Sequence, residues 1–254
     1  AFLWGPTGTG KTTTLGVLIS EYLQTFETSR VLMLSNTHSA IDGVALRVDK
    51  ELGYASQHRL RTRIYRQGEG WNQRTYIDEN CLHLVLDLDS ETKDRLIDLF
   101  KYTGNNKLNR EKYNKILNDD ALLNRKKLDK SINDRLLCMT TNSALANLSK
   151  LIESGPFDLI VFDESSQIGI PQTLMLMPLG KVRIFGGDPN QLPPVAKCKD
   201  AIVKKWIGNS VFEFMPKDSA WVCQLDEQSR MAPKICELVS KTFYDGKLKV
   251  AANV

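Results

Sequence analysis

The sequence predicts an α/β fold in which a parallel β-sheet carries helices on both faces. Three observations lead to this prediction. Short apolar runs alternate with longer amphipathic segments, which is the pattern of strands joined by crossover helices. Residues 159–162 (LIVF) show no polar alternation, as expected of a strand that is buried on both faces. A glycine-rich loop also separates the first apolar run from the first amphipathic segment.

The apolar runs have the lengths of strands. We expect strands at residues 1–4, 31–35, 136–140, 159–162, 182–185 and 221–225. A helix is expected at residues 12–26, and further helices between most of the later strands. Because the sequence opens inside the first predicted strand, we expect it to be part of a longer chain.

The alternation of short apolar runs and amphipathic segments is lost between residues 49 and 134. Residues 59–66 alternate basic and mostly apolar side chains, which predicts a strand with one cationic face made of Arg59, Arg61, Arg63 and Arg66. Residues 93–100 and 112–117 have helical spacing, and residues 104–106 predict a turn. The prediction is a core domain of residues 1–48 and 135–254, interrupted by a mainly helical accessory subdomain at residues 49–134.

Composition limits the possible classes of protein. With 254 residues, of which 42% are apolar and 25% charged, the chain is neither disordered nor fibrous. The net charge of +4 is compatible with a polyanionic partner, but most proteins with this balance bind no nucleic acid. Five scattered cysteines without a C-x-x-C pair favour a reducing intracellular compartment. No apolar run is long enough for a membrane span, so we expect no membrane partner.

Residues 5–12 match the phosphate-binding loop pattern G-x-x-x-x-G-K-[ST]. In such a loop, backbone N–H groups surround a chain of phosphates, the lysine reaches the β and γ oxygens, and the hydroxyl binds Mg²⁺. The pattern therefore predicts a nucleoside triphosphate site in which Lys11 binds phosphate and Thr12 binds the metal. The predicted phosphate-binding residues are Gly5, Pro6, Thr7, Gly8, Thr9, Gly10, Lys11, Thr12 and Thr13.

Two carboxylates follow the predicted strand at residues 159–162. At the carboxyl end of such a strand, Asp163 lies beside the phosphate loop and can hold Mg²⁺, and Glu164 can activate the attacking water. An acidic pair that caps the next helix is the structural alternative. The loop and the buried strand directly before the pair favour the catalytic interpretation.

Residues 186–195 (GGDPNQLPPV) follow another apolar strand. Their glycines, prolines and aspartate predict a rigid, sharply turning segment at the carboxyl edge of the sheet. Gln191 offers an amide that can sense a γ-phosphate. Taken alone, however, the segment is more typical of a structural turn.

Together these segments resemble the first motor domain of superfamily 1 helicases, in the branch that includes the nonsense-mediated-decay RNA helicase and senataxin. Four motifs carry the resemblance, at residues 5–12 (motif I), 163–167 (motif II, D-E-x-x-Q), 187–194 (motif III) and 225–231 (motif IV). The resemblance implies a RecA-like fold of the P-loop NTPase class, with ATP and Mg²⁺ as cofactors. The catalytic residues that it implies are Lys11, Glu164, Gln191 and Arg230, and it adds Asp163 and Gln167 to the nucleotide site.

Two of these residues have specific roles in the resemblance. Gln191 couples the γ-phosphate state to the nucleic-acid groove, and Arg230 stabilises charge on the γ-phosphate. A solvated surface arginine is the alternative for Arg230.

Two weaker segments match the nucleic-acid contacts of the family. Residues 35–42 resemble motif Ia and residues 138–144 resemble motif Ib, where hydroxyls and helix N-terminal N–H groups hold backbone phosphates without reading sequence. Both segments are also expected to cap the helices that follow. His38 stands where this branch often has asparagine. The nucleic-acid contacts implied for single-stranded DNA or RNA are Asn36, Thr37, Ala40, Thr140, Thr141 and Pro193.

The resemblance further implies a second RecA-like domain, which is absent from this chain and supplies another arginine. We therefore expect a monomer that hydrolyses ATP weakly by itself, located in the cytoplasm, or in the nucleus if the source is eukaryotic. A P-loop switch or binding module that regulates a protein partner is the main alternative function. The cationic stripe at residues 59–66 either extends the nucleic-acid path or protects an exposed sheet edge. A small-molecule kinase is disfavoured, because it leaves residues 187–194 unexplained.

Overall fold

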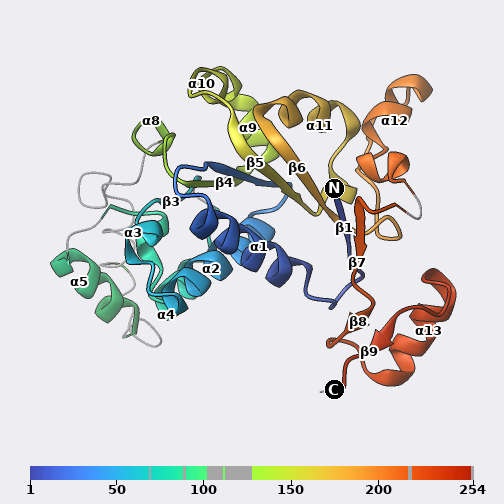
Figure 1. Ribbon diagram of the computed structural model, residues 1–254, viewed down its shortest axis with the longest axis horizontal. Coiled ribbons are helices and arrows are strands. Elements are labelled where there is room, and N and C mark those ends of the chain that lie inside the picture. Colours follow the sequence, from blue (N-terminus) through green and yellow to red (C-terminus); the bar gives the residue numbers. More distant parts are fainter. Residues whose placement is uncertain (69, 88–89, 102–110, 112–127, 217–218, 253–254) are drawn as a thin grey trace.

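A computed structural model describes residues 1–68, 70–87, 90–101, 111, 128–216 and 219–252 of the chain. Its centre is a seven-stranded sheet with helices on both faces (Figure 1). Every pairing between neighbouring strands of this sheet is parallel. In spatial order the strands are β3 (Ile64–Arg66), β4 (Leu136–Thr140), β2 (Val31–Ser35), β5 (Phe157–Asp163), β6 (Gly180–Gly187), β1 (Phe2–Trp4) and β7 (Val222–Gln224). The predicted fold class and all of the predicted strands except the one at residues 59–66 are confirmed.

Alternate residues of the central strands feed two hydrophobic cores, one on each face of the sheet. On one face, Val31 and Met33 pack with α1 (Lys11–Thr25) and α2 (His38–Tyr54). On the other face, Leu32 and Leu34 pack with α9 (Thr141–Ala146), α10 (Leu148–Glu153) and α11 (Ile170–Leu176). Because all the strands run in the same direction, the loops that follow them gather at one edge of the sheet, where ligands bind in sheets of this kind.

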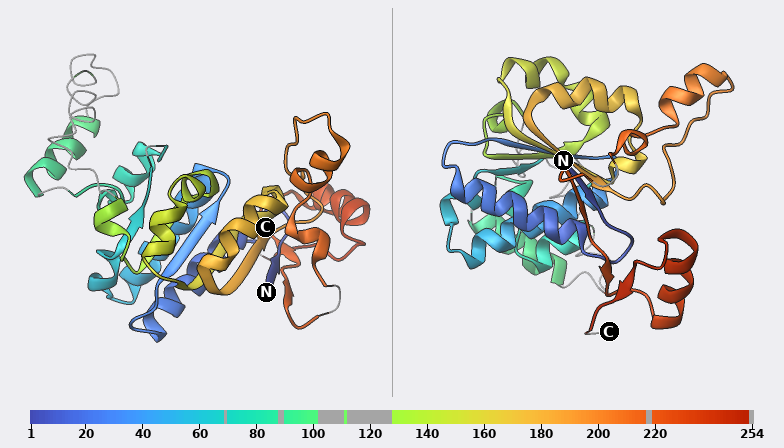
Figure 2. Two further views of the ribbon diagram at one scale, coloured as in Figure 1. Left: turned by 90° about the horizontal axis from the view of Figure 1, so that it is seen from above. Right: turned by 45° about the vertical axis from the view of Figure 1, so that its right-hand side comes forward.

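A smaller unit lies beyond β7. The strands β8 (Glu227–Gln228) and β9 (Lys249–Val250) pair in parallel, and α13 (Pro233–Phe243) packs on them around Cys236, Tyr244 and Leu248. This unit is drawn in red at the end of the main sheet in Figures 1 and 2. Between β6 and β7 the chain forms α12 (Ala201–Ile207) and the short 3₁₀ helix η4 (Val211–Phe214). In the described part of the chain, no helix has the length and apolar character that a membrane crossing needs.

The structure differs from the sequence prediction at the start of the predicted insertion. Helix α2 continues through residue 49, and β3 joins the edge of the main sheet beside β4. The segment that leaves the sheet is helical, with α4 (Gln73–Asp78), η1 (Leu82–Leu84), α5 (Ser90–Lys101) and α8 (Leu128–Ser131). Helix α5 confirms the helical spacing of residues 93–100. The predicted turn at 104–106 and the predicted helix at 112–117 lie outside the described residues.

The predicted strand at residues 59–66 is present only in its second half, as β3 at the edge of the sheet, and its single cationic face is wrong. A short helix, α3 (His58–Arg61), occupies its first half, and the arginines do not share a face. Arg61 donates two hydrogen bonds to Asp49, at 2.9 and 2.7 Å, and Arg63 donates one to Asp134 at 3.2 Å. Arg66 is buried. The basic positions Arg61, Arg63 and Arg66 therefore belong to separate ion pairs.

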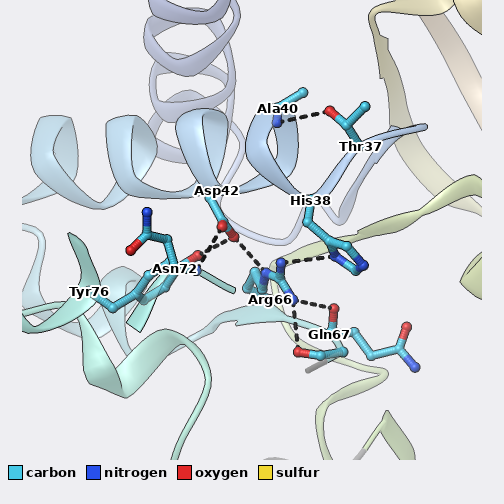
Figure 3. Close-up of polar contacts among 9 residues, drawn as sticks. Thr37, His38, Ala40, Asp42, Arg66, Gln67, Asn72 and Tyr76 are labelled. Atoms are coloured by element: carbon cyan, nitrogen blue, oxygen red, sulfur yellow. Dashed lines mark hydrogen bonds and ion pairs between the residues drawn. The ribbon is translucent and has the colours of Figure 1, made fainter. Parts of the chain in front are cut away.

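Arg66 connects β3 to the start of α2 through a buried network (Figure 3). Its guanidinium donates to Asp42 at 2.7 Å and to the backbone oxygens of Gln67 and Gly68. The Tyr76 hydroxyl donates to the same carboxylate at 3.0 Å, and burial together with Asp42 raises the pKa of Tyr76. A buried charge with this many hydrogen bonds is compensated only as long as both partners of the ion pair are present.

Replacement of Arg66 by alanine should lower the free energy of unfolding by about 3–5 kcal/mol, because Asp42 would remain as a buried charge without its partner. Arg59, which is exposed on α3, is the matched control, and Arg59→Ala should cost less than about 0.5 kcal/mol. Urea unfolding followed by circular dichroism measures both variants. Equally small losses would contradict the structural role of Arg66.

Candidate nucleotide-binding site

The glycine-rich loop connects β1 to α1 at the carboxyl edge of the sheet. Gly8 and Gly10 have φ angles of 84° and 83°, a left-handed conformation that glycine adopts without strain. The Lys11 ammonium is buried and donates to the Gly5 carbonyl at 2.6 Å, so the loop is folded around its own lysine. Gly10 provides no side-chain cap for α1. The first N–H groups of this helix therefore keep their hydrogen-bonding capacity for an anion.

Asp163 ends β5 beside this loop. Its side chain is completely buried, and this burial, reinforced by the charge of Glu164, raises the pKa of Asp163 to about 6. Lys11 and the Thr12 hydroxyl are close enough to act in the opposite direction. One carboxylate oxygen accepts the backbone N–H of Glu164 at 2.9 Å. The structure thus brings together the lysine, the hydroxyl and the carboxylate that sequence analysis assigned to one site.

Glu164 has a backbone conformation that is uncommon for a residue with a side chain. Its φ angle is 51°, in the left-handed region, and costs about 1 kcal/mol or more. This conformation turns the chain sharply from β5 into the 3₁₀ helix η2 (Ser165–Gln167). Such strain is often found at functional sites, where the surrounding structure maintains it.

The two acids have the chemistry of a magnesium site. The Oδ2 atom of Asp163 and the Oε2 atom of Glu164 are buried, and neither has a hydrogen-bond partner among the described residues. Mg²⁺ is bound in proteins by one or two carboxylates, with phosphate and water oxygens completing its shell. The Thr12 hydroxyl next to Asp163 supplies a further oxygen. These residues therefore fit a magnesium ion held between the phosphate loop and the end of β5.

Asp188 organises the segment that follows β6. It is fully buried and accepts hydrogen bonds from the Trp4 indole at 3.1 Å, the Tyr244 hydroxyl at 2.6 Å and the Gln191 amide at 3.0 Å. Gln191 also donates to the Thr7 hydroxyl at 3.1 Å, which joins this segment directly to the phosphate loop. Sequence analysis assigned Asp188 only to a turn, because its partners lie far away in the chain.

The turn that carries Arg230 rests on the phosphate loop. The Ser229 N–H donates to the Gly8 carbonyl at 3.1 Å, and a Cβ atom added at Gly8 would lie 2.6 Å from that of Arg230. Gln228 is fully buried, and its side-chain oxygen accepts the backbone N–H groups of Arg230 and Met231. Sequence analysis gave Gln228 no role, although it holds the shape of this turn. The Arg230 side chain is exposed, and its Cβ atom lies next to the phosphate loop.

The residues predicted to contact nucleic acid follow β2, β4 and β6 at the same edge. The Thr37 hydroxyl accepts the Ala40 N–H at 3.2 Å and caps α2 (Figure 3). Thr140 caps α9 in the same way, accepting the Ser143 N–H at 3.1 Å. The expectation that both segments are helix caps is therefore confirmed. Pro193, in the loop after β6, is exposed.

Asn36 and Thr141 are hydrogen-bonded to each other. The Thr141 hydroxyl donates to Asn36 at 2.6 Å, and the Asn36 amide donates to the Gln167 carbonyl at 2.6 Å. Thr141 is completely buried, and its hydroxyl is used within the protein. Only the first of the two adjacent threonines is the cap, and the second turns inward. These bonds connect the ends of β4 and β2 to the turn that follows Glu164.

Comparisons with known proteins agree with this arrangement. An AAA domain family model matches residues 1–197, and a second AAA domain model matches residues 207–254. The chain is 28% identical over 98% of its length to a Regulator of nonsense transcripts 1 homolog of Neurospora crassa, of which it covers 22%. It is 28% identical over its whole length to the DNA replication ATP-dependent helicase/nuclease DNA2 of Saccharomyces cerevisiae, of which it covers 14%.

Two further matches cover different shares of the chain. An uncharacterized ATP-dependent helicase of Methanocaldococcus jannaschii is 28% identical over 64% of the chain, which covers 23% of that protein. The chain thus spans between 14% and 23% of the length of these curated relatives. A solved structure of the PRRSV helicase matches with a TM-score of 0.45 and 15% identity, over 99% of this chain and 35% of the other.

Replacement of Gly8 by alanine should lower the free energy of unfolding by about 1–3 kcal/mol more than replacement of Gly155, because only Gly8 is overpacked by the change. Both glycines have a φ angle of 84°, so the backbone strain is matched. A Cβ atom at Gly8 collides with that of Arg230, whereas nothing lies within 4 Å of one at Gly155. Urea denaturation measures the difference. Equal losses would mean that the Arg230 turn does not rest on the loop in solution.

Proposed function

The chain belongs to the AAA domain family and to the superfamily 1 helicases of the branch that includes the nonsense-mediated-decay RNA helicase and senataxin, and from this membership we infer that it is the first motor domain of an ATP-dependent DNA or RNA helicase. The observation that carries this proposal is the convergence of Lys11, Thr12 and Asp163 at one point of the sheet edge. A phosphate loop, a metal-binding carboxylate and a neighbouring second acid are the parts that ATP hydrolysis requires.

Each residue of the proposed site has a distinct task. Lys11 binds the β and γ oxygens of ATP, and the uncapped start of α1 donates N–H groups to the phosphates. Thr12 and Asp163 hold Mg²⁺, which neutralises phosphate charge when bound. Glu164 accepts a proton from the attacking water through its buried carboxylate. Arg230 stabilises the charge that develops on the γ-phosphate, from the turn next to Gly8.

The same edge of the sheet offers a path for a single strand of nucleic acid. We propose that Thr37, Ala40 and Thr140 hold its phosphates at the starts of α2 and α9. Asn36 holds these segments in position through its hydrogen bonds within the protein. This role does not require Asn36 to contact the nucleic acid. Gln191 connects this path to the nucleotide, since it donates to Thr7 of the phosphate loop. Binding through phosphates predicts an affinity that falls steeply with salt concentration.

We propose that efficient hydrolysis needs a second RecA-like domain. An arginine supplied across a cleft between two domains can raise the rate by about 10³ to 10⁵. The chain as given should therefore bind ATP but hydrolyse it slowly. Its five cysteines are free thiols, which suits a monomer that works in a reducing compartment of the cell.

The function is tested by ATPase assays on the full-length parent with and without single-stranded DNA or RNA. Strong stimulation supports the motor, and indifference would support a switch that regulates a protein partner. The Glu164→Gln variant should lose about 10²- to 10⁴-fold in hydrolysis while its ATP affinity is kept, because only the base is removed. Glu153→Gln, at an exposed glutamate that ends α10, is the matched control and should retain full activity. Undiminished turnover by Glu164→Gln would exclude this residue as the base.

A further inference from the structure

One buried carboxylate joins three separate parts of the chain next to the phosphate loop. The Trp4 indole, at the end of β1, donates to the Oδ1 atom of Asp188. Gln191, in the loop after β6, and Tyr244, which follows α13, both donate to its Oδ2 atom. The bond from the Tyr244 hydroxyl is the shortest of the three, at 2.6 Å. The C-terminal unit therefore holds the same carboxylate oxygen to which Gln191 is bonded.

The Asp188 carboxylate also determines which way the Gln191 amide points. An ionised carboxylate only accepts hydrogen bonds, so the amide atom beside it must be the nitrogen. The same nitrogen donates to the Thr7 hydroxyl at 3.1 Å. Both amide hydrogens are then used, and the amide oxygen remains as an acceptor. A rotated amide would place its oxygen against the carboxylate and lose both bonds.

Tyr244 is a rigid donor to this carboxylate. Its side chain packs with Cys236 and Leu248 in the core of the C-terminal unit. Burial, together with the bond to Asp188, raises the pKa of the Tyr244 hydroxyl, which therefore remains a donor at neutral pH. Asp188 is itself fully buried, and a buried carboxylate is destabilised when one of its hydrogen bonds is lost. The hydroxyl thus restricts the carboxylate to one orientation.

A second contact connects the end of α13 to the same loop. The Asn190 amide donates to the Phe243 carbonyl at 2.6 Å. Phe243 is the last residue of α13 and precedes Tyr244, while Asn190 precedes Gln191. Two neighbouring hydrogen bonds therefore fix the position of the loop after β6 against the C-terminal unit.

We propose, on the basis of the proposed function, that Tyr244 is a positioning residue for ATP hydrolysis. Its hydroxyl holds Asp188 in the orientation that keeps the Gln191 amide nitrogen on Thr7 of the phosphate loop. This role does not require Tyr244 to touch the nucleotide. The C-terminal unit carries Arg230 and also controls Gln191, so both groups depend on how this unit packs against the main sheet.

Removal of one hydroxyl group tests this inference in the full-length parent. Tyr244→Phe should lower kcat for ATP hydrolysis in the presence of single-stranded DNA or RNA by about 10- to 100-fold, the cost of a misplaced group at a catalytic site. The dissociation constant of ATP should change by less than about twofold, because the phosphate loop itself is unaltered. Tyr54→Phe, at an exposed tyrosine that ends α2, makes the same chemical change and should keep full activity. An unchanged kcat in Tyr244→Phe would overturn the inference.

A double variant shows whether Tyr244 acts through Gln191. Gln191→Ala should lower kcat at least as much as Tyr244→Phe does. Addition of Tyr244→Phe to Gln191→Ala should then cause no further loss, because the side chain that is positioned is already gone. A loss equal to the product of the two single losses would overturn the inference, since the tyrosine would then act independently of Gln191. Undiminished turnover by Gln191→Ala would overturn it as well.

A second variant covers the case in which Tyr244→Phe does not fold. Asn190→Ala removes the neighbouring bond from an exposed residue, and it should lower kcat in the parent but not in the Gln191→Ala background. If it took the place of Tyr244→Phe, an unchanged kcat would overturn the inference. All of these contrary results would leave the motor proposal intact. Absence of ATP hydrolysis by the unaltered parent would overturn the proposed function and this inference together.

Discussion

The site depends on the burial of the Asp163 carboxylate beside Lys11. Removal of a carboxylate from water is unfavourable unless cations and hydrogen bonds replace the lost hydration. Lys11, the Thr12 hydroxyl and the Glu164 N–H do so only in part, since the pKa of Asp163 remains raised and its second oxygen has no hydrogen bond with the described residues. Under the proposed function, a metal-bound triphosphate at the phosphate loop would bring the further positive charge that this carboxylate lacks.

Buried hydrogen-bonded residues hold the other segments in position around this site. Asp188 binds Trp4 at the end of β1 and Tyr244 after α13, so one carboxylate joins the main sheet to the C-terminal unit. The hydrogen bond from Ser229 to Gly8 makes a second connection between them. The unit that carries Arg230 is thus attached to the main sheet at points that include or adjoin the phosphate loop.

The sequence was sufficient for the features that depend on local pattern. Parallel strands buried on both faces read as uninterrupted apolar runs, so β2 and β5 were predictable, and the phosphate loop has a fixed spacing. Features that depend on distant partners were not. The alternation around Arg66 looks like a strand with a charged face, because nothing local reveals that Asp42 neutralises this arginine. For the same reason, the sequence around Thr141 does not show that its hydroxyl is bonded to Asn36.

Hydrogen bonds among Thr141, Asn36 and Gln167 connect the proposed nucleic-acid site to the proposed nucleotide site. Gln167 ends the turn that Glu164 begins, and the strained backbone of Glu164 persists only while its surroundings maintain it. A ligand that shifts the ends of β2 and β4 therefore acts on the same turn that holds the proposed base. Coupling between two binding sites is reciprocal. If a nucleic-acid strand and the nucleotide both favour the same arrangement of this turn, each ligand must raise the affinity for the other by the same factor.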